Sequence, residues 1–248
     1  MLELVSIITP CYNSEKFISD TILSVQKQTY THWEMIIVDD GSQDKTVEMV
    51  QNFMEDDHRI HLVTLHKNSG AAKARNAGIE KIKGKYMTFL DADDIWFPDF
   101  IENSIETIKK SGIHFVFSSY KRSNENLEFI YSDFIVPKKV TYTDILKTNS
   151  ISCLTAFIDV EVLGIKKMPD ILKRQDMGLW LKYLKEIPYA YGIQEPQAIY
   201  RIRENSLSRN KKKSFKIPMG FLLLCGKTGL FSFYLLYGSL DGSRIFKI

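Results

Sequence analysis

Three carboxylates stand close together at Asp91, Asp93 and Asp94, directly after the apolar run 86–90. Like charges this close repel one another, so bringing them together in a folded chain costs free energy unless a cation or hydrogen-bond donors offset the repulsion. Carboxylate oxygens are the ligands that Mg²⁺ and Mn²⁺ prefer. The cluster therefore predicts a site for a divalent cation.

Polar residues also follow the three earlier apolar runs. Residues 10–15 follow the first, Asp39 and Asp40 the second, and residues 68–70 the third, just before Lys73 and Arg75. A divalent cation beside a lysine and an arginine suits a diphosphate. Two alternatives stay open: the aspartates could form only a turn and a helix cap, and the two basic residues could lie on a solvated helix face.

The glycine pattern narrows the kind of diphosphate ligand. No G-x-G-x-x-G follows the first apolar run and no G-x-x-x-x-G-K-[ST] occurs, so neither a dinucleotide cofactor nor a P-loop is favoured. Phosphates would then be held by the metal and by side chains. Asp39 is placed to accept hydrogen bonds from a base or a ribose.

The elements that position these residues follow from periodicity. The apolar runs 4–9, 33–38, 60–65 and 86–90 predict strands, and apolar residues at helical spacing predict helices over 17–25, 47–54 and 71–82. This alternation predicts an α/β fold with a doubly wound, mostly parallel sheet. Ligands bind beyond the carboxyl ends of such strands, which is where these polar residues lie.

Beyond residue 98 the pattern is less regular and predicts the second wall of a cleft. The elements expected there are a helix at 99–111, a strand at 114–120, a strand at 129–136, a helical turn at 143–147, a strand at 153–159 and a helix at 176–185.

Composition limits the class of protein. With 248 residues, 44% hydrophobic and 25% charged, the chain predicts one compact domain and excludes a disordered chain, a collagen-like fibre or a disulfide knot. Three widely spaced cysteines, Cys11, Cys153 and Cys225, favour free thiols in a reducing cytosol. The N-terminal residues lack a basic region, so they predict a strand rather than a signal peptide.

Charge is distributed unevenly along the chain. The net charge of +3 is too small to indicate nucleic acid, but residues 201–248 carry +8 and the remainder carries −5. A basic cluster at 209–213 precedes an apolar stretch at 217–240 that Lys227 and several glycines interrupt. A charge at the bilayer centre is costly, so interfacial helices on an anionic membrane are favoured over a span. A core or dimer helix is the alternative.

Four linked segments resemble the family 2 glycosyltransferases of the GT-A fold. They are V-S-I-I-T-P-C-Y-N-S-E (5–15), I-I-V-D-D-G-S-Q-D-K-T (36–46), N-S-G-A-A-K-A-R-N-A-G-I (68–79) and Y-M-T-F-L-D-A-D-D-I-W (86–96). R-Q-D-M-G-L-W-L (174–181) and Y-R-I-R-E-N-S-L-S (200–208) are similar to the bacterial branch that builds surface polysaccharides. The resemblance implies a GT-A domain at 1–210, with a nucleotide-sugar half at 1–115 and an acceptor half at 116–210, and a basic, apolar tail at 211–248.

The resemblance also implies residue roles. Asp176 matches the catalytic base, Asp93 matches the metal aspartate of the D-x-D motif, and Asp91 would contact the ribose or donor sugar beside the metal. Donor binding is implied for Pro10, Tyr12, Asn13, Glu15, Asp39 as the uracil ligand, Asp40, Lys73 and Arg75. A helix cap is the alternative for Asp176, and Trp96 and Trp180 could be sugar platforms or core residues.

One position departs from the family pattern. Many relatives carry a histidine where this chain has Arg203, so this position cannot supply an imidazole ligand for the metal. An arginine there implies a contact with the donor diphosphate or with an acceptor phosphate.

The function implied is that of an inverting glycosyltransferase that needs Mn²⁺ or Mg²⁺. It would move a sugar from a UDP-sugar to a hydroxyl of a glycan or a polyprenyl-diphosphate-linked acceptor, in O-antigen, capsule or teichuronic acid synthesis. Its expected place is cytoplasmic, peripheral on the inner face of the cytoplasmic membrane. The alternatives are a metal-dependent nucleotidyltransferase or phosphatase, and a non-catalytic nucleotide-sugar binding protein.

Overall fold

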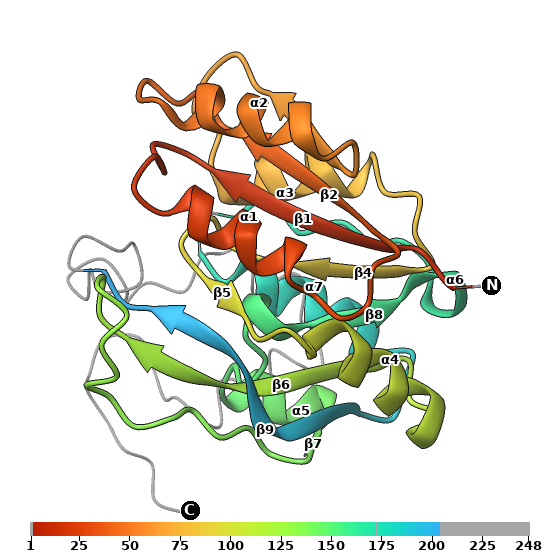
Figure 1. The fold of residues 1–248 in the computed structure, drawn as a ribbon. Coiled ribbons are helices and arrows are strands. Elements are labelled where there is room, and N and C mark those ends of the chain that lie inside the picture. The colour runs from red at the N-terminus through yellow and green to blue at the C-terminus, as the bar shows by residue number, and fades with distance from the viewer. Residues whose placement is uncertain (1, 172, 204–248) are drawn as a thin grey trace, which may run out of the picture.

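The computed structural model describes residues 2–171 and 173–203, and the strands in this part of the chain form one mixed sheet (Figure 1). They are β1 Val5–Cys11, β2 Trp33–Asp39, β3 Ile60–Thr64, β4 Tyr86–Phe89, β5 Ile95–Trp96, β6 Phe115–Ser123, β7 Lys139–Val140, β8 Phe157–Asp159 and β9 Ala190–Arg201. The helices are α1 Ile18–Gln26, α2 Thr46–Asp56, α3 Ala71–Ile79, α4 Phe100–Ser111, α5 Tyr142–Lys147, α6 Val160–Leu163 and α7 Gln175–Leu184, with a 3₁₀ turn, η1, at Cys153–Thr155. The strand order is β3-β2-β1-β4-β8-β6-β9-β5, and β7 pairs with β9.

The first half of the sheet confirms the predicted alternation of strands and helices. β1 lies between β2 and β4, β3 pairs with β2, and all three pairs are parallel. The apolar runs are continuous because both faces are covered. Met35 and Ile37 of β2 belong to the same core cluster as α1, whereas Ile36 and Val38 pack with Ala74 of α3.

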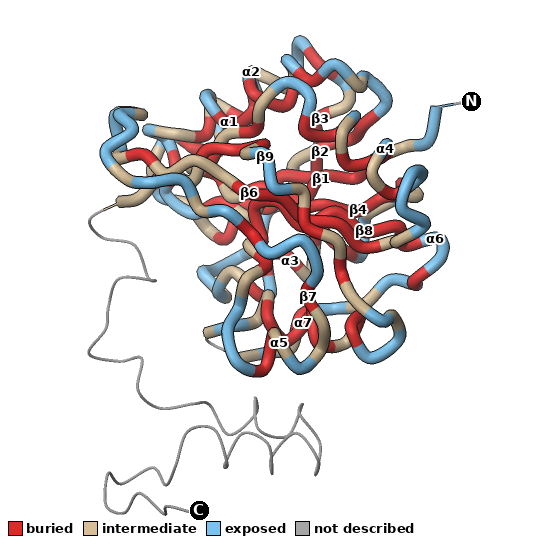
Figure 2. Tube along the Cα trace, turned by 90° about the horizontal axis from the view of Figure 1, so that it is seen from below, coloured by how far each residue is buried: buried red, intermediate tan, exposed pale blue. Residues whose placement is uncertain are grey.

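The second half continues the same sheet. β8 runs antiparallel to both β4 and β6 and so joins the two halves, and β9 runs parallel to β6. Trp180 of α7 packs under this region, with its ring centroid 6.1 Å from that of Phe89 and 5.3 Å from that of Phe115. Buried residues concentrate along the sheet and the elements that face it (Figure 2).

The strand predicted at 129–136 is wrong. This segment makes a single bridge to β6, between Tyr120 and Phe134, and leaves Phe129, Ile130 and Ile135 exposed. Three of the apolar side chains that suggested a strand lie in solvent, and beyond the bridge at Phe134 the segment forms no continuous pairing with β6.

The strand predicted at 153–159 is correct only at its end, because η1 occupies its first residues. Two indoles explain the change: Trp96 Nε1 donates to the Leu154 carbonyl at 2.8 Å, and Trp180 Nε1 donates to the Ile151 carbonyl at 3.1 Å. These carbonyls are therefore bound to side chains and not to a neighbouring strand.

β9 was not predicted, although it is the longest strand that the structure describes. Gly192 and Pro196 break the alternation of its side chains, and its register with β6 shifts around Ser119. Gly192 is required where β9 meets the segment before β7, because a Cβ there would lie 2.2 Å from the Pro137 carbonyl oxygen.

The predicted tail at 211–248, with its apolar stretch at 217–240, lies outside the described residues. In the part of the chain that the structure describes, no helix has the length and hydropathy needed to cross a membrane.

Candidate active site

The loops of the predicted site meet at the carboxyl edge of the parallel strands. β1 and β2 end in register, with Cys11 opposite Asp39, and Asp39 in turn lies opposite Thr64 of β3. The acidic loop after β4 begins beside β1, since Leu90 N donates to the Ile8 carbonyl at 3.0 Å. The sheet therefore brings all four polar segments to one edge.

Asp39 and Asp40 organise this edge. Both are nearly fully buried. The Asp39 carboxylate accepts hydrogen bonds from the backbone N–H groups of Gly41 and Ser42, so it forms the turn that the residue types allowed. Asp40 accepts from Ser69 N and Gly70 N, each at 2.7 Å, and thereby ties the end of β2 to the start of α3.

The loop after β1 is joined to the loop after β2. Asn13 Oδ1 accepts from Gln43 N at 2.8 Å, and Glu15 Oε2 accepts from Lys45 N at 3.0 Å. These two predicted donor-binding side chains are thus engaged between the loops. Pro10 is half-buried at the end of β1, and Tyr12 presents an exposed ring at the same edge, 45% accessible.

Arg75 is the buried cation of the site. Its guanidinium pairs with Asp91 and is only 8% exposed, so the solvated-face alternative is wrong for this residue. Lys73, two residues earlier in α3, is exposed, and its Nζ lies 3.9 Å from Asp170 Oδ2. Asp91 and Asp176 both favour the charged form of Arg75, which therefore lies in the field of both carboxylates.

Asp176 approaches from the second half of the chain, in the first turn of α7. The N-cap of that helix is Arg174, in a left-handed conformation, so Asp176 is not the N-cap residue, although its carboxylate accepts from the backbone N–H of Met177 in the first turn. Asn149 Nδ2 donates to Asp176 Oδ2 at 2.9 Å. Burial raises the pKa of this carboxyl above its usual value, whereas Arg75 and Asn149 act in the opposite direction.

Asp93 and Asp94 have different environments. Asp93 Oδ2 lies 2.6 Å from Arg203 Nε, and burial raises the pKa of Asp93 while this arginine lowers it. Asp94 is fully buried, and burial together with the charges of Asp93 and Asp91 raises its pKa well above the usual value. Its Oδ2 atom has no hydrogen-bond partner among the described residues.

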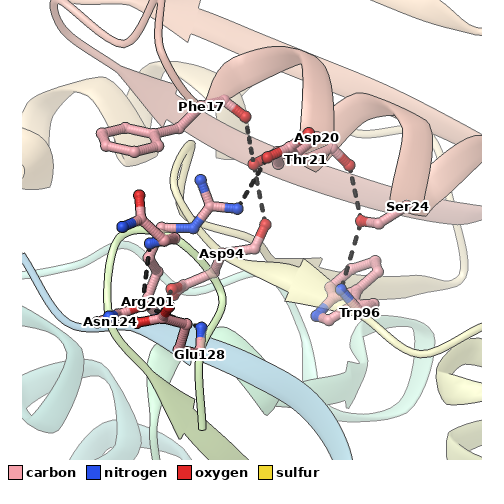
Figure 3. A network of polar contacts seen from close by, with 10 residues as sticks. Phe17, Asp20, Thr21, Ser24, Asp94, Trp96, Asn124, Glu128 and Arg201 are labelled. Carbon is pink, nitrogen blue, oxygen red and sulfur yellow. Dashed lines mark hydrogen bonds and ion pairs between the residues drawn. The ribbon is translucent and has the colours of Figure 1, made fainter. Parts of the chain in front are cut away.

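A polar network joins the acidic loop to α1 and to the end of β9 (Figure 3). Asp94 Oδ1 accepts from Arg201 N, and the Asp94 carbonyl accepts from Thr21 Oγ1, both at 2.9 Å. Arg201 also donates to Asp20 Oδ2 at 2.9 Å, and its guanidinium carbon lies 4.9 Å from the centroid of the Phe17 ring. This network holds the end of β9, two residues before Arg203, beside the acidic loop.

The residues present fit a divalent cation that arrives with a diphosphate. Within residues 2–171 and 173–203, no three His, Cys, Asp or Glu side chains gather into a complete metal cage. Mg²⁺ and similar ions at phosphate sites need only one or two carboxylates, because the phosphates supply further oxygens. Asp93 and Asp91 supply such carboxylates, and the unpartnered Asp94 oxygen lies in the same loop.

Sequence reasoning missed two groups of functional neighbours. The first is Asn149, which contacts Asp176, and the second is the pair of Asp20 and Arg201. No spacing signal marks Asn149, because it lies in an irregular loop far from Asp176 in sequence. Trp96 and Trp180 are both fully buried, so the core alternative is correct and the sugar-platform alternative is wrong.

Comparison with known proteins agrees with this geometry. Residues 6–158 match the family model described as Glycosyl transferase family 2. The chain is 44% identical over 213 residues to the putative teichuronic acid biosynthesis glycosyltransferase TuaG of Bacillus subtilis, covering 86% of this chain and 84% of TuaG. It is 40% identical over 214 residues to the Escherichia coli protein named UDP-Glc:alpha-D-GlcNAc-diphosphoundecaprenol beta-1,3-glucosyltransferase WfgD, covering 86% and 83%.

A solved structure supports the fold. The chain matches S. aureus TarS 1-349 in complex with UDP-GlcNAc with a TM-score of 0.71 at 20% identity, over 90% of this chain and 64% of that one. The fold is therefore GT-A-like, and the chain spans less than two thirds of that TarS chain. The family match includes Asp39, Asp91 and Asp93, and the similarity to TuaG covers most of the chain, so this protein belongs to glycosyl transferase family 2.

Proposed function

We propose that this enzyme transfers a sugar from a UDP-sugar to a hydroxyl of a glycan or polyprenyl-diphosphate-linked acceptor, with inversion, in bacterial surface-polysaccharide synthesis. One observation carries the proposal: Arg75 pairs with Asp91 and also favours the charged form of Asp176, so donor-side and acceptor-side carboxylates share one centre. The names of TuaG and WfgD support the polysaccharide context, and the UDP-GlcNAc complex of TarS supports a UDP-sugar.

The nucleotide would bind at the carboxyl edge. Tyr12 offers an exposed ring to the base, and Asp39 would accept from the uracil next to it. Asp40 would act through the α3 loop that it holds, which leads to Lys73 and Arg75. Pro10, Asn13 and Glu15 would contribute to donor binding by shaping the loop after β1.

The diphosphate would lie beside Asp93 and Arg203. A cavity of about 470 Å³ reaches Arg203 from the side of the first two loops. Its lining consists of Asn13, Glu15, Lys16, Phe17, Gln43, Asp44, Glu125 and Arg203, and does not include Asp93. Mn²⁺ or Mg²⁺, when bound, neutralises charge that builds on the leaving diphosphate. Asp93 and Asp91 would hold this ion, and Arg203 would add a second positive charge.

Asp176 would act as the general base. Its raised pKa brings the carboxylate closer to the proton affinity of an efficient base near neutral pH. It takes the proton from the acceptor hydroxyl, and that oxygen attacks the anomeric carbon opposite the leaving UDP. A single displacement of this kind inverts the anomeric configuration, as it does in glycoside hydrolysis.

The membrane location rests on sequence and on relatives' names. Residues 201–248 carry a net charge of +8 and the apolar stretch 217–240. WfgD and a second E. coli relative, WfaP, are named for an undecaprenol-linked acceptor. An enzyme attached peripherally to the inner face of the cytoplasmic membrane would meet a lipid-linked acceptor on the same surface. Family membership argues against the nucleotidyltransferase, phosphatase and sensor alternatives.

The test is turnover with a defined donor and acceptor. Purified protein is incubated with UDP-glucose or UDP-GlcNAc and a synthetic GlcNAc-α-diphosphate alkyl ester, and UDP release and product anomers are followed by NMR. Asp176→Asn should reduce turnover by at least about 100-fold and leave UDP affinity unchanged. Asp133→Asn, which changes an exposed carboxylate that has no role in the proposed site, is the control. Normal turnover in Asp176→Asn would contradict the base assignment.

A further inference from the structure

A second side chain holds the carboxylate of Asp176. Asn149, in the loop between α5 and η1, donates from Nδ2 to Asp176 Oδ2 at 2.9 Å. We propose that Asn149 is a positioning residue for sugar transfer: its hydrogen bond to Oδ2 fixes the orientation of the carboxylate that receives the proton of the acceptor hydroxyl. The inference rests on the proposed role of Asp176 as the base.

The chemistry of an amide suits this role. The Nδ2 group has two hydrogens and no accessible lone pair, so it donates and cannot take the proton that the base must take. A hydrogen bond to a carboxylate favours its charged form, which is the form a base needs. A carboxylate at position 149 would act in the opposite way, because two carboxylates would then compete for one proton.

The loop that presents Asn149 is anchored on both sides. Before it, Thr148 N donates to the Asp144 carbonyl at 3.0 Å, at the end of α5. After it, the carbonyl of buried Ile151 accepts from Trp180 Nε1 at 3.1 Å. Trp180 belongs to α7, the helix that carries Asp176. The helix α7 therefore carries Asp176 and also holds the loop of Asn149, which keeps these two side chains in a fixed relative position.

Several other groups also act on the Asp176 carboxylate. Arg75 of α3 favours the carboxylate, and Asp91 after β4 disfavours it. The thiol of Cys153 in η1 stays neutral, because burial raises its pKa far above the usual value. The backbone N–H of Met177 in α7 favours the carboxylate. Asn149 adds a donor that keeps the same charge at every pH.

The experiment measures the ionisation of Asp176 directly and through catalysis. The pKa is read by carboxyl NMR of ¹³C-aspartate-labelled protein, with the resonance assigned by its loss in Asp176→Asn. In parallel, the pH profile of kcat/KM is measured with the donor and acceptor given above, since it reports ionisation in the free enzyme. The variants are Asn149→Ala and Asn149→Asp, and Thr148→Ala in the same loop is the control.

Asn149→Ala should raise the pKa of Asp176 by about 0.5–1 unit, because it removes one donor to the charged form from a partly exposed site. The acidic limb of kcat/KM should move up by the same amount, and kcat should fall about tenfold, the effect of a misdirected base. Asn149→Asp should raise the pKa of Asp176 and the acidic limb of kcat/KM further, because the two neighbouring carboxyl groups then share a proton. UDP affinity and melting temperature should match those of Thr148→Ala.

Three results would overturn the inference, and they are distinguishable. If Asp176→Asn loses turnover but neither Asn149 variant shifts the pKa or the acidic limb, Asp176 is the base and Asn149 does not position it. If Asp176→Asn keeps turnover, the proposed base is wrong and the positioning role fails with it. Equal, pH-independent losses in Asn149→Ala and Asn149→Asp would indicate a role in loop structure alone.

Discussion

Replacing Arg203 with alanine should change metal binding and nucleotide binding in opposite directions. In the structure, Arg203 Nε lies 2.6 Å from Asp93 Oδ2, so the carboxylate expected to hold the metal is already paired with a cation. A metal ion alone must displace this guanidinium. A diphosphate offers the guanidinium new oxygens and frees Asp93 for the metal.

The size of the effect follows from exposure. Exposed ion pairs contribute at most about 1 kcal/mol, and breaking a buried pair costs about 3–5 kcal/mol. The side chains of Arg203 and Asp93 are 35% and 18% exposed, so the free energy of their ion pair should lie closer to the value for exposed pairs than to the value for buried pairs. We take about 1–2 kcal/mol, which corresponds to a 5- to 30-fold tighter binding of Mn²⁺ alone in Arg203→Ala. Losing a charge-assisted hydrogen bond to the diphosphate should weaken UDP binding about 10- to 100-fold.

The assay is Mn²⁺ binding by electron paramagnetic resonance without nucleotide, and UDP binding by calorimetry at saturating Mn²⁺. Arg203→His provides an imidazole in place of the guanidinium and should bind Mn²⁺ more tightly than Arg203→Ala. The control is Arg122→Ala on β6, because Arg122 donates to Ser132 and not to the acidic loop. The reasoning is refuted if Arg203→Ala leaves Mn²⁺ affinity unchanged or lowers it together with UDP affinity.

Three further predictions concern the metal, the fold and the membrane. Asp93→Ala, or EDTA, should abolish UDP release while the circular dichroism spectrum is kept, and full activity in EDTA would exclude a metal requirement. Gly192→Ala should lower the melting temperature by several degrees, since overpacking costs about 1–3 kcal/mol and the new Cβ would meet the Pro137 carbonyl; an unchanged transition would contradict the close approach. The full chain should sediment with anionic liposomes at low salt and less at high salt, and removing the residues after Ser208 should release it with UDP binding intact; indifference to anionic liposomes would leave no case for membrane attachment.

The elements of the first half could be predicted because their signals are local. β1 to β4 are short runs made mostly of apolar residues, and the helices between them carry apolar residues at helical spacing. Once the strands are parallel, their carboxyl ends must share an edge, so Asp39, Arg75 and Asp91 could be grouped before any coordinates were known. The second half lacks such signals. The exposed apolar side chains of 129–136 imitate a strand, and the glycine and proline of β9 conceal one.

The sequence by itself therefore determined the residue types of the site, the edge of the sheet where they gather and the family. Only the tertiary structure decided which groups are paired. Arg75 lies 16 residues before Asp91, Asn149 lies 27 before Asp176, and Arg201 lies 107 after Asp94. The third pair joins the two halves of the chain, and the first two lie within one half each. All three depend on how separate elements pack together, and local periodicity carries no information about that packing. Protonation follows the same rule, because burial and the nearest charge set each carboxyl's pKa, and both are properties of the folded chain.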